Sequence, residues 1–103
     1  MKIEVLTIAR DDLQQIHEFL LLEYGQSLPA KFRMSFEKFC SNVQAMPYMY
    51  SKYMQNLNYR SAVIAYDYIV FYKVNEDEGV IKIYRVLHGK RNIEPLLNTH
   101  SDD

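Results

Sequence analysis

Two runs of β-branched and aromatic residues, at 68–75 and 79–88, constrain the fold more than any other feature of the sequence. A short acidic turn separates them. Runs of this composition joined by a short turn predict the two antiparallel strands of a β-hairpin. A third run at 59–65, joined to the first by Tyr66 and Asp67, extends the hairpin to a three-stranded antiparallel meander.

The last predicted strand ends in a group of cationic and titratable residues. His88 is its final residue, and Lys90 and Arg91 follow directly after Gly89. Strict alternation along the strand places Arg85 on the face opposite to His88. Because the strand brings these three residues to one end of the sheet, this end is the predicted functional site.

Residues before the meander predict two helices that form an antiparallel hairpin. Asp11 or Asp12 is the expected N-cap of the first helix, and Gly25 ends it. Ser27 is the expected N-cap of the second helix, which Pro47 stops. Apolar residues at helical spacing predict the core stripe of the second helix, which consists of Phe32, Phe36, Phe39, Val43 and Met46.

The remaining segments complete the predicted α+β fold. Residues 2–8 alternate imperfectly and indicate a short N-terminal strand, whereas 47–58 lack periodicity and indicate a loop. The segment 90–97 predicts a final turn, and the polar residues 99–103 a frayed tail. The expected order is β-α-α-β-β-β, with the helix hairpin packed on one sheet face and a single domain over 1–98.

Composition excludes several functional classes. A net charge of −1 over 103 residues lacks the strong positive charge of a nucleic-acid-binding domain, so we expect no specific DNA binding by this chain alone. The single cysteine, Cys40, and the lack of a signal peptide or membrane-spanning run predict a cytoplasmic protein. His17, His88 and His100 are too dispersed for a metal site, and no motif indicates a cofactor.

Three segments resemble the RelE/ParE superfamily, the toxins of bacterial type II toxin–antitoxin systems. They are Tyr-Arg at 59–60, Tyr-Ile-Val-Phe-Tyr-Lys-Val at 68–74 and Ile-Tyr-Arg-Val-Leu-His-Gly-Lys-Arg at 83–91. The resemblance spans nearly the whole chain, because a helix hairpin followed by three strands also matches the family fold. The segment 85–91 looks like the ParE-like, plasmid-stabilisation branch.

The resemblance implies one of two mechanisms. ParE-like members inhibit DNA gyrase, whereas RelE-like members enter the ribosome and cut mRNA. The RelE pattern has an Arg where this chain has Ile69, and a Tyr where it has the segment 94–97. Losing one transition-state contact typically lowers a rate by about 10²–10³-fold, so the two missing groups favour gyrase inhibition. Arg91 does match the Arg of the family's terminal Gly-Lys-Arg.

The resemblance also assigns roles to individual residues. The expected target-binding residues are Arg85, His88, Lys90 and Arg91. If the chain is instead a nuclease, the candidate catalytic residues are Arg60, His88, Lys90 and Arg91, with His88 as general acid or base. A purely structural interpretation is also open, in which His88 is hydrogen-bonded at the sheet margin and Arg60 pairs with Asp67.

The resemblance implies a cognate antitoxin whose disordered C-terminal segment folds over the toxin. The first helix is apolar almost all round, so we expect Leu13, Ile16 and Leu20 to face inward and Phe19 and Leu22 to contact the antitoxin. Alternatively, another part of the same chain covers this face. A third possible function is a degenerate, non-toxic module that only sequesters an antitoxin.

Overall fold

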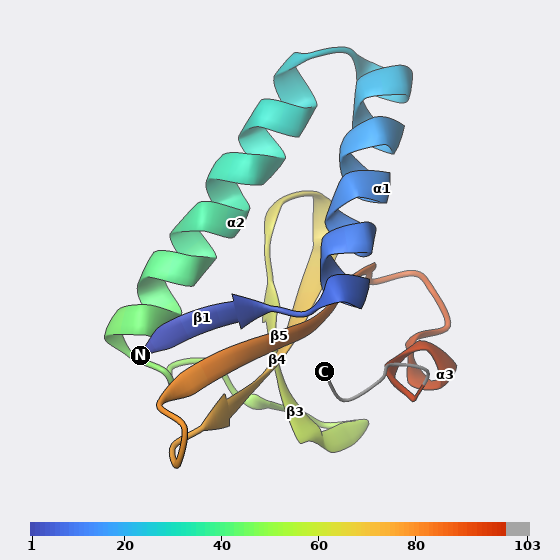
Figure 1. Ribbon diagram of the computed structural model, residues 1–103. Coiled ribbons are helices and arrows are strands. Elements are labelled where there is room, and N and C mark those ends of the chain that lie inside the picture. The colour runs from blue at the N-terminus through green and yellow to red at the C-terminus, as the bar shows by residue number, and fades with distance from the viewer. Residues whose placement is uncertain (99–103) are drawn as a thin grey trace.

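The computed structural model is a five-stranded sheet with two long helices on one face (Figure 1). It describes residues 1–98, and the predicted frayed tail at 99–103 lies outside the described residues. The elements in chain order are β1 (Lys2–Val5), α1 (Thr7–Tyr24), α2 (Ser27–Ala45), β2 (Lys52–Tyr53), β3 (Asn56–Val63), the 3₁₀ turn η1 (Ala65–Asp67), β4 (Tyr68–Asn75), β5 (Val80–His88) and α3 (Ile93–Leu97).

The strand order across the sheet is β1-β5-β4-β3-β2. Strands β3, β4 and β5 form the predicted antiparallel meander, and β1 pairs in parallel with β5. The predicted α+β class and helix hairpin are therefore confirmed. The segment 47–58 differs from the predicted loop, because the two-residue strand β2 and the first part of β3 lie within it.

The helix hairpin packs its predicted apolar stripe against the sheet. Phe32, Phe39 and Val43 of α2 are buried in the same core cluster as the helix-facing residues of the strands. Met46 differs from the prediction, because α2 ends at Ala45 and leaves Met46 62% exposed. The link between the helices is as short as predicted, so they must run antiparallel.

Helix α1 begins earlier than the sequence predicts. It starts at Thr7, so neither Asp11 nor Asp12 is its N-cap. The preceding residue, Leu6, is buried and donates its backbone N–H to the carbonyl of Ile83 at 3.0 Å. Burial of Leu6 beside the sheet therefore starts the helix directly after β1, and Asp12 falls in its second turn.

A β-bulge changes which residues of β5 share a face. Phe71 of β4 pairs with Arg85, but the next residue, Tyr72, pairs with Ile83, so Tyr84 is the extra residue. The strict alternation predicted for this strand was therefore wrong. Odd-numbered residues face the helices before the bulge, and even-numbered residues face them after it.

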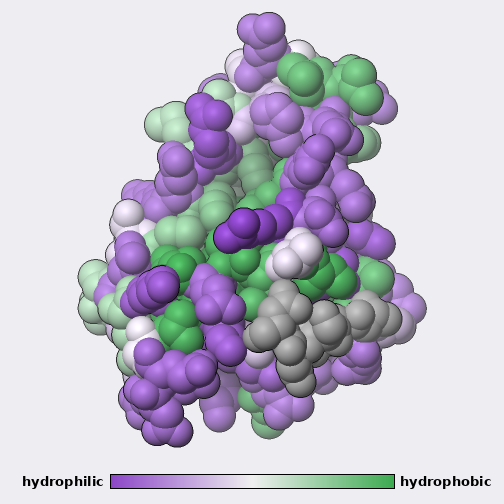
Figure 2. Space-filling view, in the orientation of Figure 1, coloured by the Kyte–Doolittle hydropathy of each residue, from purple (hydrophilic) through white to green (hydrophobic). Residues whose placement is uncertain are grey.

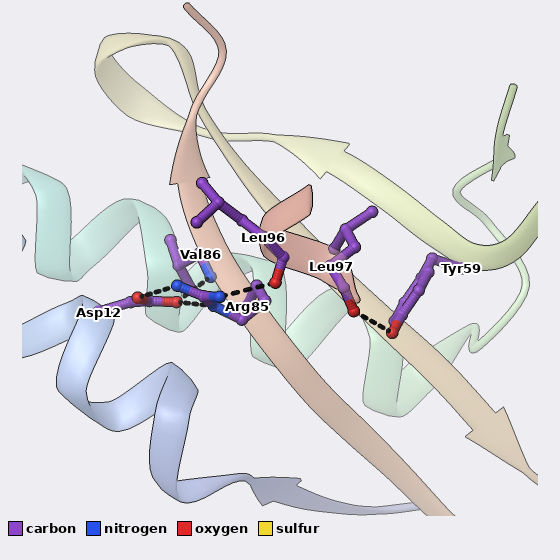
Figure 3. Close-up of polar contacts among 6 residues, drawn as sticks. All are labelled: Asp12, Tyr59, Arg85, Val86, Leu96 and Leu97. Carbon is purple, nitrogen blue, oxygen red and sulfur yellow. Dashed lines mark hydrogen bonds and ion pairs between the residues drawn. The ribbon is translucent and has the colours of Figure 1, made fainter. Parts of the chain in front are cut away.

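The second sheet face has a small core of its own. Helix α3, which lies within the predicted C-terminal turn, covers part of this face. Its buried cluster consists of Leu6, Tyr59, Phe71, Tyr84, Leu87, Ile93 and Leu97. The Tyr59 hydroxyl donates to the carbonyl oxygen of Leu97 at 3.2 Å, which ties the end of α3 to β3 (Figure 3).

A buried ion pair joins α1, β5 and α3 (Figure 3). The Nε and Nη2 atoms of Arg85 donate to Oδ2 and Oδ1 of Asp12 at 2.8 and 2.9 Å. Its Nη1 donates to the carbonyl of Leu96 at 2.8 Å, and the backbone N–H of Val86 donates to Asp12 Oδ2 at 3.0 Å. The Asp12 carboxylate thus accepts hydrogen bonds from both the Arg85 guanidinium and the backbone of β5.

This ion pair corrects the role expected for Arg85. Asp12 is 7% exposed and Arg85 is 6% exposed, and the guanidinium is engaged by α1 and α3. β1 ends at Val5, opposite Ile83, so the later part of β5 is a sheet edge that Asp12 covers. Arg85 therefore holds the fold together, and we remove it from the target-binding set.

We expect Asp12→Ala to lower the free energy of unfolding by about 3–5 kcal/mol, because it leaves the buried Arg85 without its carboxylate. Urea denaturation measures this change. Asp11→Ala, at an exposed neighbour on the same helix, is the matched control and should change stability by less than about 0.5 kcal/mol. Replacing both partners, as in Asp12→Leu with Arg85→Met, should recover much of the loss. Equal stability of Asp12→Ala and the control would contradict the role of the pair.

Burial, with a contribution from the Glu37 carboxylate, raises the pKa of the Cys40 thiol to about 11. The thiolate is the reactive form, and an ordinary cysteine has a pKa of about 8.5. At pH 8 we therefore expect iodoacetamide to modify the native protein roughly 100-fold more slowly than the urea-unfolded protein. Mass spectrometry over a time course measures both rates, and similar rates would show that Cys40 is accessible.

Candidate functional site

Three of the predicted site residues lie together where β5 ends. His88, Lys90 and Arg91 line one groove of about 560 Å³. Its other side is formed by α1, which contributes Phe19 and Tyr24. The ion pair described above holds α1 against β5 and so positions the two sides of this groove.

Backbone hydrogen bonds fix the turn that carries the basic pair. The N–H of Arg91 donates to the carbonyl of His88 at 3.0 Å, and the N–H of Lys90 donates to His88 Nδ1 at 3.1 Å. The N–H of Gly89 donates to the carbonyl of Asp67 at 2.8 Å, and a Cβ on Gly89 would lie only 3.2 Å from that oxygen. Glycine therefore allows the two turns to approach each other closely.

The position of His88 limits what its ring can do. Nδ1 accepts the Lys90 N–H, so the hydrogen bond assigns the proton of the neutral ring to Nε2. The ring also meets Tyr68 edge-on, with centroids 5.0 Å apart. Because the lone pair of the neutral ring is engaged, this geometry favours a structural His88 over a general base.

The α1 side of the groove carries two exposed aromatic rings, beside the polar lining residues Asp12 and Gln15. Phe19 and Tyr24 are 49% and 60% exposed, and Lys90 and Arg91 on the other side are exposed as well. Figure 2 shows further apolar side chains at the tip of the helix hairpin, where Leu22 is 85% exposed. Of the two residues expected to contact an antitoxin, Phe19 lines the groove and Leu22 lies outside its lining.

Arg60 does not take part in this site. Its Nη1 donates to the carbonyl of Tyr50 at 2.8 Å, and its guanidinium lies 4.8 Å from the centroid of the Tyr48 ring. The structure therefore pairs Arg60 with the segment that precedes β2. It does not show the ion pair with Asp67 that the structural interpretation expected.

The pairing of the strands shows that two nuclease candidates, Arg60 and His88, lie far apart along the sheet. Arg60 pairs with Tyr72 of β4, and His88 pairs with Tyr68. These partners are four residues apart on β4, which corresponds to about 13 Å along the strand. Arg60 and His88 therefore do not converge on one phosphate.

An apolar side chain fills the position at which the RelE pattern has an arginine. Ile69 packs against the buried cluster on the α3 side of the sheet. Arg85 lies on the same face, but its guanidinium turns to Asp12 at the sheet edge. The residues 94–97 form most of α3, and of these Leu96 and Leu97 pack in the core rather than in the groove.

Two aromatic residues line the groove although the sequence did not predict them as site residues. Tyr24 comes from the end of α1 and Tyr68 from the start of β4. Burial, with Tyr24 nearby, raises the pKa of the Tyr68 hydroxyl, so this hydroxyl stays protonated over the physiological range. The sequence does not indicate that Tyr24 and Tyr68 lie in the same groove. Their proximity depends on how α1 packs beside the strand hairpin.

Within residues 1–98, no three His, Cys, Asp or Glu side chains come close enough to hold a metal ion. None of the helices in this part of the chain is long and apolar enough to cross a lipid bilayer. The chemistry of the site thus rests on exposed cations beside aromatic and aliphatic side chains.

Comparisons with known proteins agree with the fold. The family model described as the ParE toxin of type II toxin–antitoxin system, parDE, matches residues 3–93. A solved structure described as the chromosomal ParDE TA system from P. aeruginosa has a TM-score of 0.72 and 14% sequence identity, and the match covers 85% of this chain and 95% of that chain. No curated protein matches the sequence. The extent of the family match establishes that this chain belongs to the ParE toxin family of type II toxin–antitoxin systems.

Proposed function

We propose that this toxin acts by binding and inhibiting DNA gyrase, and that a cognate antitoxin neutralises it. The observation that carries the proposal is the geometry of the basic turn. Lys90 and Arg91 are exposed on a backbone held by hydrogen bonds, while the other groups that RNA cleavage would need lie elsewhere.

Cleavage of RNA needs cations around the developing phosphate charge and a group that moves a proton at the 2′-hydroxyl. Arg60 is separated from His88 by about 13 Å along the sheet. The imidazole lone pair of His88 already accepts a backbone N–H, and Ile69 is apolar. These positions support binding of a protein target over a RelE-like attack on mRNA in the ribosome.

The basic turn has the properties of a protein-binding surface. Arginine is enriched among the residues that dominate binding energy at interfaces, and a cationic surface favours association with an acidic partner. The hydrogen bonds of Arg91, Lys90 and Gly89 hold the turn before any partner arrives. Such preorganisation lowers the entropy lost on binding.

The exposed apolar side of the groove suits the antitoxin. Phe19, Leu22 and Tyr24 offer apolar area on one helix, and an antitoxin segment that folds on binding could cover it. Because Phe19 and Tyr24 share the groove with Lys90 and Arg91, a segment bound there would also shield the cations from the target. Because gyrase is a cytoplasmic enzyme, the proposal implies that the toxin acts in the cytoplasm. The free Cys40 fits this reducing compartment.

We expect the purified protein to inhibit gyrase supercoiling of plasmid DNA, and Lys90→Ala with Arg91→Ala to require a concentration about 10- to 100-fold higher. This range corresponds to the loss of a charged hydrogen-bonding partner, about 1.5–3 kcal/mol. Lys31→Ala with Lys38→Ala removes two exposed cations from α2 and should leave inhibition unchanged. Urea denaturation would verify that both variants remain folded.

The same protein should be added to translating ribosomes, with transcripts mapped for codon-positioned cuts. Cut transcripts together with unaffected supercoiling would overturn the gyrase proposal in favour of a RelE-like endonuclease. Neither effect, with antitoxin binding retained, would identify a non-toxic module instead.

A further inference from the structure

The turn between β3 and β4 holds two residues other than glycine in the left-handed region of backbone space. Tyr66 has φ 60° and ψ 33°, and Asp67 has φ 62°. The N–H of Tyr68 donates to the carbonyl of Ala65, which closes a turn of type I′. Such turns favour Asn, Asp or Gly at both central positions, whereas a bulky residue with positive φ is strained.

The surrounding structure holds this strained turn from two sides. The N–H of Ala65 donates to Oγ of Ser35 in α2 at 3.0 Å. On the other side, the carbonyl of Asp67 accepts the N–H of Gly89 at 2.8 Å. The second contact makes the Tyr66 turn and the basic turn neighbours on one surface, fixed relative to each other.

Tyr66 lies outside the packed core of the fold. Tyr66 is 38% exposed, and it belongs to neither of the two buried clusters. Asparagine would adopt the same backbone angles with less strain. Strained residues that the surrounding structure keeps in place cluster at functional sites, so the outlier points to a role outside the fold.

We infer that Tyr66 is a target-contact residue that binds together with Lys90 and Arg91, an inference that rests on the proposed function. The chemistry fits an acidic protein surface with an apolar recess for the ring, since tyrosine and arginine are enriched at binding hot spots. The hydrogen-bonded turn fixes the direction in which Tyr66 leaves the backbone, so less freedom is lost when the ring binds.

Tyr66→Asn separates this role from stability. Relief of the strain should raise the Tm by roughly 4–8 °C, the shift typical of one strained residue in a domain of this size. Loss of the ring should weaken gyrase inhibition at least about tenfold, as for a hot-spot side chain. Asp67→Asn is the matched control: it changes the adjacent central position of the turn to another favoured residue, keeps the ring, and should not weaken inhibition. Tyr66→Phe should retain most of the inhibition.

Three results for the purified Tyr66→Asn variant would overturn the inference. A Tyr66→Asn variant that gains stability and inhibits as well as the wild type would make Tyr66 a strained turn residue and nothing more. A variant with a lower Tm would show that the tyrosine supports the fold. The antitoxin should bind Tyr66→Asn as tightly as the wild type, and a loss there would assign the ring to the antitoxin instead.

Growth arrest on induction in cells distinguishes a failure of this inference from a failure of the gyrase proposal. If the wild type arrests growth without affecting supercoiling, the gyrase target is wrong, and Tyr66→Asn should still lose arrest. If Tyr66→Asn arrests growth like the wild type, the inference is wrong whatever the target is. A wild type that arrests nothing would overturn both.

Discussion

The ion pair between Asp12 and Arg85 is the interaction on which the arrangement of the molecule depends. It links α1 to β5 through two hydrogen bonds, and Arg85 reaches α3 through a third. Both groups are desolvated, so neither is tolerated without the other. The same carboxylate satisfies the backbone of β5 where β1 no longer pairs with it. The pair thereby sets the distance between α1 and the basic turn.

The candidate site is built from strand ends rather than from a constellation of catalytic groups. The bulge at Tyr84 turns His88 toward the helices, and the turn that follows presents Lys90 and Arg91 to solvent. A backbone contact with Asp67 joins this turn to the neighbouring hairpin turn. Backbone hydrogen bonds make such a surface rigid without aligning proton-transfer groups, which suits recognition of a partner better than bond cleavage.

Much of the fold could be predicted from the sequence because its signals are local. Apolar spacing located both helices, β-branched runs located β3, β4 and β5, and Gly25 marked the end of α1 with a φ of 81°. The position of His88, Lys90 and Arg91 at one sheet end also followed, since it requires only that one strand end there. Local patterns of this kind act within a few residues, so tertiary packing rarely reverses them.

The sequence by itself determined the helix hairpin, the antiparallel meander and the basic residues at its end. Only the tertiary structure decided that Asp12 is a buried partner instead of a helix cap, and that Arg85 is an internal contact instead of a surface one. The pairing joins residues 73 positions apart, and no local sequence pattern marks the bulge one residue before Arg85. A sequence does not distinguish a charged residue in solvent from one that pairs with a distant carboxylate. Desolvation depends on how the folded chain packs, so it cannot be predicted from local pattern.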